Sequence, residues 1–377
     1  MTKADKEGQR KTPVLRFKGF TDDWEQRKLG KVATFINGRA FKQNELLDSG
    51  KYKVLRVGNF YTNDSWYYSN LELADKYYID KGDLVYTWSA TFGPHIWNGE
   101  KVIYHYHIWK IELSKFLDRD FTLQILEADK AKLLANTNGS TMIHVTKKGM
   151  ESKVISLPTI EEQKQIGLYL TKFDTLIALY DRKLKLLSQV KKYFLDNLFA
   201  EKEYPNLRFK GFTDAWEQRK LENLLKVNSG KNYKQLGEGN IPVYGTSGYM
   251  LSVNKSLSEN DAIGIGRKGT IDRPQFLKAP FWTVDTLFFL TLKHMNDLNF
   301  IYYKFQNINW KKYDESTGVP SLTKNTINKI RISIPQLNEQ SKIKQLFTSL
   351  DNLIALYENK KQDLIEIKNE LLNTMFI

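Results

Sequence analysis

The word GIGRKG at residues 264–269 is the part of this sequence that comes nearest to a chemical site. It fits the G-x-G-x-x-G fingerprint of dinucleotide-binding turns, and Asp285 follows about twenty residues later, where that fingerprint places an acid for the ribose. Pro274, however, leaves no room for a helix N-terminus to hold a pyrophosphate, and Asp285 lies in the β-like run TVDTLFFLTL. Nucleotide binding is therefore disfavoured. Two interpretations stay open: a basic glycine loop that touches DNA backbone, or a plain turn.

A second candidate is the pair His105 and His107, which flank Tyr106. Alternation along a strand would point both imidazoles to one face. Zinc would need at least one more protein ligand, and the chain has no Cys and no clear third ligand nearby. We therefore favour a polar strand face, with base-edge reading as one option, over metal binding.

Enzyme motifs are missing elsewhere in the sequence. It contains no G-x-x-x-x-G-K-[ST] run for phosphate and no G-x-S-x-G nucleophile elbow. It also lacks the Asn/Asp-Pro-Pro-aromatic word that amino-methyltransferases carry. Its Asp and Glu residues show no spacing that would define a general acid and base. The sequence thus predicts no catalytic residue, no metal and no cofactor in this chain.

The net charge points instead to an acidic partner. The chain has 377 residues, a formal net charge of +14 and 41% hydrophobic residues. That is long enough for more than one core, and basic enough to favour nucleic acid, an anionic membrane face or an acidic protein. No apolar run of about 18 residues is present. We expect a cytoplasmic protein, without membrane association, whose residues 1–12 form a flexible tail.

An internal duplication organises the chain. The word PVLRFKGFTDDWEQRKL at 13–29 returns as PNLRFKGFTDAWEQRKL at 205–221, with fifteen of seventeen positions identical at an offset of 192. A second block, which starts with ISLP at Ile155, returns as ISIP at Ile332, at an offset of 177. The interiors between these blocks share only scattered words. Such a pattern predicts one scaffold built twice, with pseudo-two-fold symmetry, that carries two different working parts.

The second repeated block is predicted to form a long helix in each copy. Thr159 and Glu162 have the spacing of a capping box after Pro158, whereas Gln336 replaces the threonine in the second copy. Apolar residues then recur at intervals of three, four and seven, which indicates a coiled-coil-like seam over about 40 residues, or roughly 60 Å. Two matched copies favour mutual pairing over an ordinary bundle stripe. The seam residues are Phe173, Ile177, Tyr180, Leu184 and Leu187 in the first copy and Leu350, Ile354, Tyr357 and Leu364 in the second.

The two interiors, 33–154 and 225–331, differ in charge. The first carries 16 basic and 14 acidic residues, and the second carries 15 and 8. Both mix short apolar runs with Gly, Asn and Ser, as small α/β domains with exposed loops do. Their small polar loops with Thr-Lys pairs suit phosphate contacts, although ordinary surface loops would look the same. The strand candidates are Lys53–Val57, Leu84–Trp88, His105–Leu113, Ala262–Ile265 and Thr283–Leu292.

The two repeated words together resemble the specificity subunits of type I restriction–modification systems. The resemblance covers nearly the whole chain, from about Pro13 to Phe376. Its specific marks are RFKGFTD-x-WEQRKL, which opens each half, and Pro-x-x-x-Glu-Gln-x-x-Ile, which opens each helix. The second mark stands here as Pro158, Glu162, Gln163 and Ile166, and again as Pro335, Glu339, Gln340 and Ile343.

The resemblance implies an α+β fold in which two globular α/β target-recognition domains are separated by two long antiparallel coiled-coil helices. Each domain is expected to read one half of a split, asymmetric DNA target. The helices are expected to hold two methyltransferase subunits that carry S-adenosylmethionine and methylate adenine. Two restriction subunits that use ATP and Mg²⁺ can join them. The expected boundaries are a tail at 1–12, domains at 13–154 and 201–331, and helices at 155–200 and 332–377.

Basic, polar and aromatic residues of the two interiors are the candidates for DNA contact, since Lys and Arg can serve phosphate or guanine. In the first half they are Arg39, Lys42, Arg56, Trp88, Ser89, Thr91, Ser140, Thr146 and Lys147. In the second half they are Lys231, Tyr233, Lys234, Arg267, Lys268, Thr270, Ser316, Ser321 and Lys324.

Two other classes of function stay open on the sequence alone. One is an enzyme that uses the glycine loop, for which nucleotide binding in calorimetry would speak. The other is a helical adaptor with two protein-binding ends. Binding to random duplex DNA in the presence of the methyltransferase partner would separate that adaptor from a DNA reader.

Overall fold

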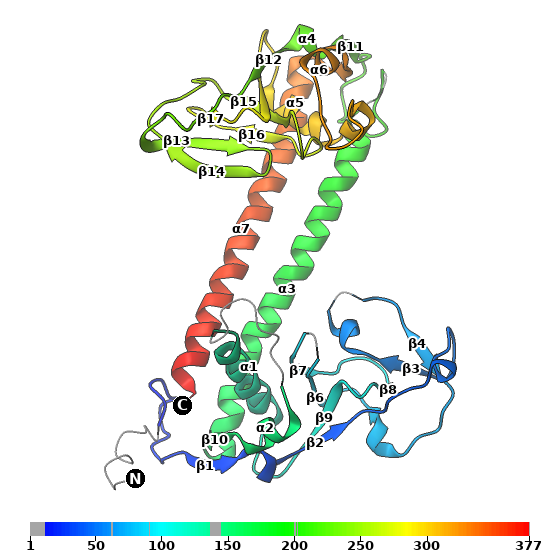
Figure 1. Ribbon diagram of the computed structural model, residues 1–377, viewed down its shortest axis with the longest axis vertical. Helices are drawn as coiled ribbons and strands as arrows, with labels where there is room; N and C mark the ends of the chain where they lie inside the picture. Colours follow the sequence, from blue (N-terminus) through cyan, green and yellow to red (C-terminus); the bar gives the residue numbers. More distant parts are fainter. Residues whose placement is uncertain are drawn as a thin grey trace. The chain divides into compact units, whose positions relative to one another are not determined.

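The computed structural model describes residues 12–61, 63–89, 91–135, 145–199, 201 and 203–376. The chain divides into two compact units. Unit 1 comprises residues 1–180 and 360–377, and unit 2 comprises residues 181–359. Helices α3 (Ile160–Leu198) and α7 (Leu337–Met375) contribute one half to each unit, and Figure 1 shows both as continuous helices. Each has 39 residues, which confirms the predicted length.

The two long helices pack against each other within each unit. In unit 2 the ammonium of Lys191 on α3 lies 2.6 Å from the carboxylate of Asp351 on α7, and Lys183 lies over the ring of Tyr357. A later residue of α3 therefore contacts an earlier residue of α7, which shows that the two segments run antiparallel. In unit 1 Lys368 pairs with Asp174. These two residues are the copies of Lys191 and Asp351, so the same contact occurs twice with its partners exchanged, as a pseudo-two-fold axis requires.

The residues of the predicted seam recur at spacings of three, four and seven on the two long helices. All nine of its residues are half-buried, while the positions on the outer face of each helix are exposed. The predicted capping box is only half right. The hydroxyl of Thr159 accepts a 3.4 Å hydrogen bond from the backbone N–H of Glu162, but the carboxylate of Glu162 does not return to the helix start. It is fully buried and accepts two hydrogen bonds from Arg16, at 2.6 and 2.8 Å.

The repeated words form the same frame in each unit. Strand β1 (Glu25–Lys28) pairs antiparallel with β10 (Val154–Leu157), and β11 (Glu217–Lys220) pairs antiparallel with β19 (Arg331–Ile334). Arg208 repeats the bidentate contact of Arg16, with two 2.8 Å bonds to the nearly buried carboxylate of Glu339. Each long helix is thereby tied at its start to the N-terminal word of its own half.

Two glutamine side chains fasten the interiors to these helix starts. The amide of Gln163 donates to the carbonyl of Pro158 and accepts from the backbone N–H of Asp118. Gln340 does the same with Pro335 and Asp297. Because both amides satisfy backbone groups in partly or fully buried surroundings, the Glu-Gln word is a structural joint.

The interior of unit 1 has two four-stranded sheets. The first, in spatial order, has β2 (Ala33–Asn37), β9 (Ile108–Leu113), β6 (Leu84–Thr87) and β7 (Gly93–Ile96), all antiparallel. The second has β4 (Tyr67–Ser69), β3 (Tyr52–Leu55), β8 (Val102–Tyr104) and β5 (Tyr78–Ile79). The helical elements are α1 (Arg119–Ala135), α2 (Lys147–Ser152) and the 3₁₀ turns η2 (Leu29–Lys31), η3 (Gln43–Glu45), η4 (Val57–Phe60) and η5 (Asp75–Tyr77).

The interior of unit 2 has a four-stranded and a three-stranded sheet. The first has β12 (Leu225–Ser229), β18 (Leu287–Leu292), β15 (Ala262–Gly266) and β16 (Gln275–Leu277). The second has β14 (Gly248–Val253), β13 (Glu238–Gly245) and β17 (Trp282–Thr283). The helical elements are α4 (Leu221–Leu224), α5 (Leu298–Gln306), α6 (Lys324–Lys329) and the 3₁₀ turn η6 (Trp310–Tyr313).

Two of the five strand predictions are wrong in the same way. The strand expected from His105 starts only at Ile108, and the strand expected over 283–292 is interrupted between Thr283 and Leu287. Residues 105–107 and 284–286 form turns instead, so His105 and His107 do not share a strand face. The other three candidates match β3, β6 and β15 to within two residues at each end.

The end of each long helix completes the core at the start of the other. Met375 at the end of α7 and Phe376 just after it are buried in the core of unit 1, where Phe376 packs on Phe121. Their copies, Leu198 at the end of α3 and Phe199 just after it, are buried in the core of unit 2. Among the described residues, no helix is long and apolar enough to cross a membrane.

Candidate nucleic-acid interface

A tight crossing in unit 1 brings Arg39 beside the turn at 105–107. The backbone N–H of Gly38 donates to the carbonyl of Ile108, and the N–H of Arg39 donates to that of Tyr104. A Cβ atom on Gly38 would overlap the carbonyl oxygen of His105. Only glycine allows the two backbones to approach this closely, so Gly38 fixes the position of Arg39.

Unit 2 contains the same crossing. Gly230 donates to Leu287 and Lys231 donates to Thr283, while a Cβ on Gly230 would overlap the carbonyl oxygen of Val284. Lys231 is therefore the counterpart of Arg39. The two interiors share this backbone path although their sequences have diverged.

The other side of each turn is held by a second pair of counterparts. In unit 1 the backbone N–H of Trp88 donates to His107, and its indole N–H donates to the carbonyl of Tyr106 at 3.0 Å. In unit 2 the backbone N–H of Arg267 donates to Thr286, and its guanidinium donates to the carbonyl of Asp285 at 3.4 Å. We call residues 105–107 and 284–286 the tip turns. Each projects one exposed central residue, Tyr106 or Asp285.

The tip turn of unit 1 is aromatic, and burial lowers the pKa of both of its histidines. The ring centroids of His105 and His107 lie 4.9 Å apart, and Trp88 packs edge-on against His107. Burial lowers the pKa of His105 to about 4, with a smaller effect from His107 and Arg56. A neutral imidazole offers one donor and one acceptor. Nearby, the guanidinium of Arg56 lies 4.2 Å from the ring centroid of Tyr67.

The tip turn of unit 2 is surrounded by cations. Lys231, Arg267 and Lys268 are exposed around it. The charged groups of Arg267 and Lys324 both lie within 6.0 Å of the centroid of Phe288, so they converge on one ring. Phosphate contacts in DNA complexes come from such groups, which position a protein on the duplex without reading its sequence.

The GIGRKG word is the end of a strand and a tight loop. Strand β15 ends at Gly266, where a Cβ would overlap the carbonyl oxygen of Thr270, and the chain continues through the loop into β16. Gly269, at φ +97°, donates its N–H to Pro320. No helix follows between residues 262 and 277, so this word cannot hold a pyrophosphate as a dinucleotide-binding turn does.

The remaining predicted residues are less uniformly placed. Arg39 is engaged by Glu45 through bonds of 2.9 and 2.7 Å, and Thr146 caps α2, where Lys147 lies 3.7 Å from Glu151. Ser140 lies outside the described residues. Lys42, Ser89 and Thr91 are exposed or half-buried surface residues of unit 1, and Lys234 and Thr270 are such residues of unit 2.

Three predicted residues of unit 2 have local structural contacts. Tyr233 packs against the core around Val243. Ser316 and Ser321 donate their backbone N–H groups to the carboxylate of Asp314, and these bonds lower the pKa of that carboxyl. The isolated bridge between Ser321 and Lys268 joins this loop to the basic side of the tip turn.

Sequence reasoning missed Asp285 and did not place Tyr106 in the site. Both lie in turns that were read as strand. A signal was present, because Gly38-Arg39 and Gly230-Lys231 are separated by the same 192 residues as the first repeated word. Matching glycines at that offset would have marked the crossing.

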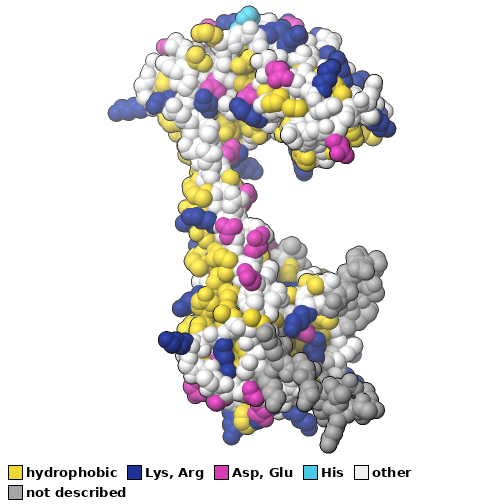
Figure 2. Space-filling model, turned by 90° about the vertical axis from the view of Figure 1, so that its left-hand side faces the viewer, with side chains coloured by type: hydrophobic (Ala, Val, Ile, Leu, Met, Phe, Trp, Pro, Cys, Tyr) yellow, Lys and Arg dark blue, Asp and Glu magenta, His cyan; other side chains and the backbone are white. Residues whose placement is uncertain are grey.

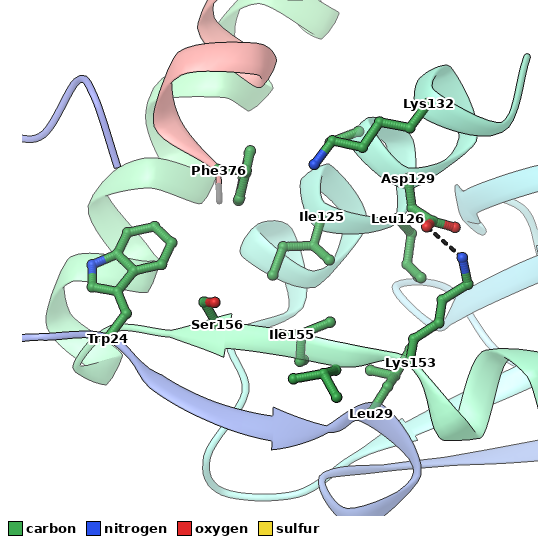
Figure 3. A pocket seen from close by; sticks show the side chains of 12 residues that line it. Trp24, Leu29, Ile125, Leu126, Asp129, Lys132, Lys153, Ile155, Ser156 and Phe376 are labelled. Carbon is green, nitrogen blue, oxygen red and sulfur yellow. Dashed lines mark hydrogen bonds and ion pairs between the residues drawn. The ribbon is translucent and has the colours of Figure 1, made fainter. Parts of the chain in front are cut away.

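A pocket in unit 1 lies outside this interface. Its volume is about 170 Å³, and its walls include Trp24, Ile125 and Phe376. Figure 3 shows the ion pair of Lys153 and Asp129, 2.5 Å long, on the side of the pocket away from Trp24. None of its lining residues belongs to the tip turn.

The pocket is explained by smaller side chains. Gln124 and Tyr303 bond the counterparts Asp174 and Asp351, which aligns Leu126 of α1 with Phe305 of α5. Phe305 is fully buried in unit 2, and the smaller leucine leaves space in unit 1. We therefore interpret this pocket as a packing difference between the units.

The outer faces of the long helices carry exposed apolar residues. Leu186, Val190 and Tyr193 on α3 in unit 2 are 52%, 41% and 56% exposed. Their spacing of four and three places them on one helix face. Figure 2 shows hydrophobic side chains gathered along the helical segment.

Comparison with known proteins agrees with this layout. The family model of the type I restriction modification DNA specificity domain matches residues 21–189 and 213–366. The type I restriction enzyme MjaVIII specificity subunit of Methanocaldococcus jannaschii is 25% identical over 94% of this chain and 92% of its own length. The EcoBI specificity subunit of Escherichia coli is 27% identical over 48% of this chain and 38% of its own.

Solved structures show the same fold. The S subunit of a type I restriction–modification system from M. genitalium has a TM-score of 0.68 at 17% identity, and the match covers 97% of this chain and 99% of that one. A structure concerning complex assembly and conformational transition of the type I R-M system has a TM-score of 0.51 at 13% identity, over 94% and 97% of the two chains. Because the family model matches both halves, this chain belongs to the specificity subunits of type I restriction–modification systems, the non-catalytic subunits that recognise DNA, and it carries two recognition domains.

Proposed function

We propose that this subunit reads a bipartite, asymmetric DNA target, one half with the tip-turn region of each unit. The observation that carries the proposal is the shared crossing of Gly38-Arg39 and Gly230-Lys231, which presents different exposed side chains in the same place. Basic residues around each turn supply phosphate contacts, and the tips face the base edges. The site of action is the cytoplasm, where bacterial and archaeal DNA lies.

The long helices are proposed to hold two methyltransferase subunits, which carry S-adenosylmethionine and methylate adenine in each half of the target. Two restriction subunits with ATP and Mg²⁺ complete the nuclease. Adenine must leave the stack to be methylated, and this chain contributes the positioning that brings partner and base together. The candidate docking surface is the exposed face around Leu186, Val190 and Tyr193.

Exchange of residues 33–154 for the interior of another specificity subunit tests the DNA-reading proposal. Sequencing of methylated adenines should show a new half-site joined to an unchanged one at the same separation, because unit 2 and the helices are untouched. The reciprocal exchange of 225–331 should change only the other half. A target altered in both halves, or in neither, would contradict the assignment.

The docking proposal has a matched variant within the chain. The copies of Leu186 and Tyr193 on α7 are Asp363 and Glu370, so an acidic residue is accommodated at these helix positions. The double variant Leu186→Asp, Tyr193→Glu should keep its helix but lose a bound methyltransferase subunit, which native mass spectrometry of the co-purified complex would show. Ser188→Asp is a control on an exposed residue of the same helix. An intact complex with the double variant would rule out this docking face.

A further inference from the structure

Asp285 is an exception among the aspartates of the second interior. Asp261, Asp272 and Asp297 each form an ion pair with a lysine, and Asp314 accepts hydrogen bonds from two serines. The carboxylate of Asp285 makes no hydrogen bond or ion pair with any residue of unit 2 that the structure describes. It is exposed at the centre of the tip turn.

The surroundings of Asp285 make this unpaired acid informative. Lys231, Arg267 and Lys268 flank it and are exposed, as expected of groups that contact phosphate. A carboxylate aimed at phosphate would be repelled, by about 1 kcal/mol per charge at 4 Å even in water. The acid therefore opposes the role of its neighbours unless it points between the phosphates, toward the base edges.

A carboxylate can only accept hydrogen bonds, so it selects bases that present a donor. In the major groove the donors are the exocyclic amino groups, N4 of cytosine and N6 of adenine, and acidic side chains characteristically accept from cytosine N4. We propose that Asp285 is a specificity-determining residue of unit 2 that accepts a hydrogen bond from an exocyclic amino group in the major groove. This inference rests on the proposed function and adds to it the chemistry of one base position.

The corresponding turn of unit 1 presents a side chain of different chemistry, and this difference supports the inference. Tyr106 occupies the corresponding tip and is 38% exposed. Its hydroxyl can donate as well as accept, and its ring can contact a thymine methyl group. The same backbone turn thus presents an acceptor in one unit and an amphipathic ring in the other, as two readers of unlike half-sites require.

Asp285→Asn in the assembled methyltransferase complex tests the inference. Asparagine keeps the shape but adds an amino donor, which suits the donor–acceptor pair of adenine. Genome-wide sequencing of methylated adenines should show that one position in the half-site of unit 2 changes its base preference. The discrimination should change by about 5- to 150-fold, the range expected for one good base contact. The base pair that wild type selects at that position, G·C or A·T, distinguishes cytosine from adenine as the source of the amino group.

Glu259→Gln removes one negative charge from the same interior and should leave base preference unchanged. A uniform rise in the affinity of Asp285→Asn for all sequences would overturn the inference, because it would mean that the acid only repels phosphate. Unaltered preference would overturn it as well. Failure of the wild-type complex to methylate a defined sequence would instead defeat the proposed function.

Discussion

The helix starts of the two units are chemically alike, whereas their tip turns share a backbone path and almost no side chains. Arg16–Glu162 recurs as Arg208–Glu339 with the same bidentate geometry. Tyr106, by contrast, is replaced by Asp285. Buried ion pairs tolerate little change, because removal of one partner strands the other without water. Exposed tips have no such constraint. The two units therefore keep the same residues where each domain is held to its helix, and they differ in the residues that the tip turns expose.

The largest expected effect is on the repeated frame. Glu162→Ala leaves Arg16 without its partner in a largely buried position and should cost about 3–5 kcal/mol of unfolding free energy in unit 1. Glu339→Ala should cost about the same in unit 2. Denaturant unfolding with hydrogen exchange, which assigns the loss to a unit, measures both. Glu25→Ala breaks an exposed pair with Arg27 and serves as the control, at under about 1 kcal/mol. Clearly unequal losses from Glu162→Ala and Glu339→Ala would break the comparison.

The next largest expected effect is a difference between the two units in how much stability they lose at low pH. Burial lowers the pKa of His95 in unit 1 to about 4, and Lys130 adds a smaller effect. Because the folded-state pKa lies below that of the unfolded chain, the stabilising contribution is complete above pH 6.5 and is lost as the pH falls toward 4. Unit 1 should therefore lose about 2 kcal/mol between pH 7 and pH 5 through this group. In unit 2 the pKa of Lys304 is lowered to about 8 by burial, so that group titrates above this range.

Hydrogen exchange at pH 7 and pH 5 measures this difference, and His95→Asn should remove the contribution of His95. Burial raises the pKa of Glu127 in unit 1, which works in the opposite sense and favours unit 1 at low pH. If the wild type and His95→Asn lose the same stability on acidification, the assignment to His95 is wrong.

The last stability effect concerns the crossings. Gly38→Ala and Gly230→Ala should each cost about 1–3 kcal/mol, because the added methyl group overlaps a backbone carbonyl that cannot move far. The displacement also shifts the tip turn, so each variant should relax reading of its own half-site alone. Gly318→Ala, where the added carbon meets nothing within 4 Å, is the control. Thermal unfolding and mapped methylation measure both effects, and relaxation of both half-sites by one variant would contradict separate readers.

The frame was accessible to sequence reasoning because it is written twice. Copies at offsets of 192 and 177 residues identified the duplicated scaffold and its long helices, and helical periodicity predicted the seam from Phe173 to Leu364. The strand pairs β1–β10 and β11–β19 were not predicted. The bond from Arg16 to Glu162 could not be foreseen, since the two residues lie 146 positions apart in the chain. Local patterns describe neighbours along the chain and carry little information about such distant partners.

The tip turns, by contrast, were not predicted from the sequence. Tyrosine, valine and threonine favour extended structure, so the runs from His105 and Thr283 predicted strands without interruption. What bends the chain is the crossing at Gly38 and Gly230, a tertiary contact from more than fifty residues away. Local preference and global structure disagree here, and such disagreements are expected where a protein makes its functional contacts.

The end of α7 lies in the core of unit 1, and this determines which of the two units can complete its core first during synthesis. Phe376 and the last turn of α7 belong to the core of unit 1, yet the ribosome makes them only after all of residues 181–359. At ordinary translation speeds that stretch takes roughly 10–40 s. Through this interval Phe121 lacks the aromatic side chain of Phe376, which packs against it in the folded protein. The unit that is synthesised first therefore becomes complete last, after its twin has all the residues it needs.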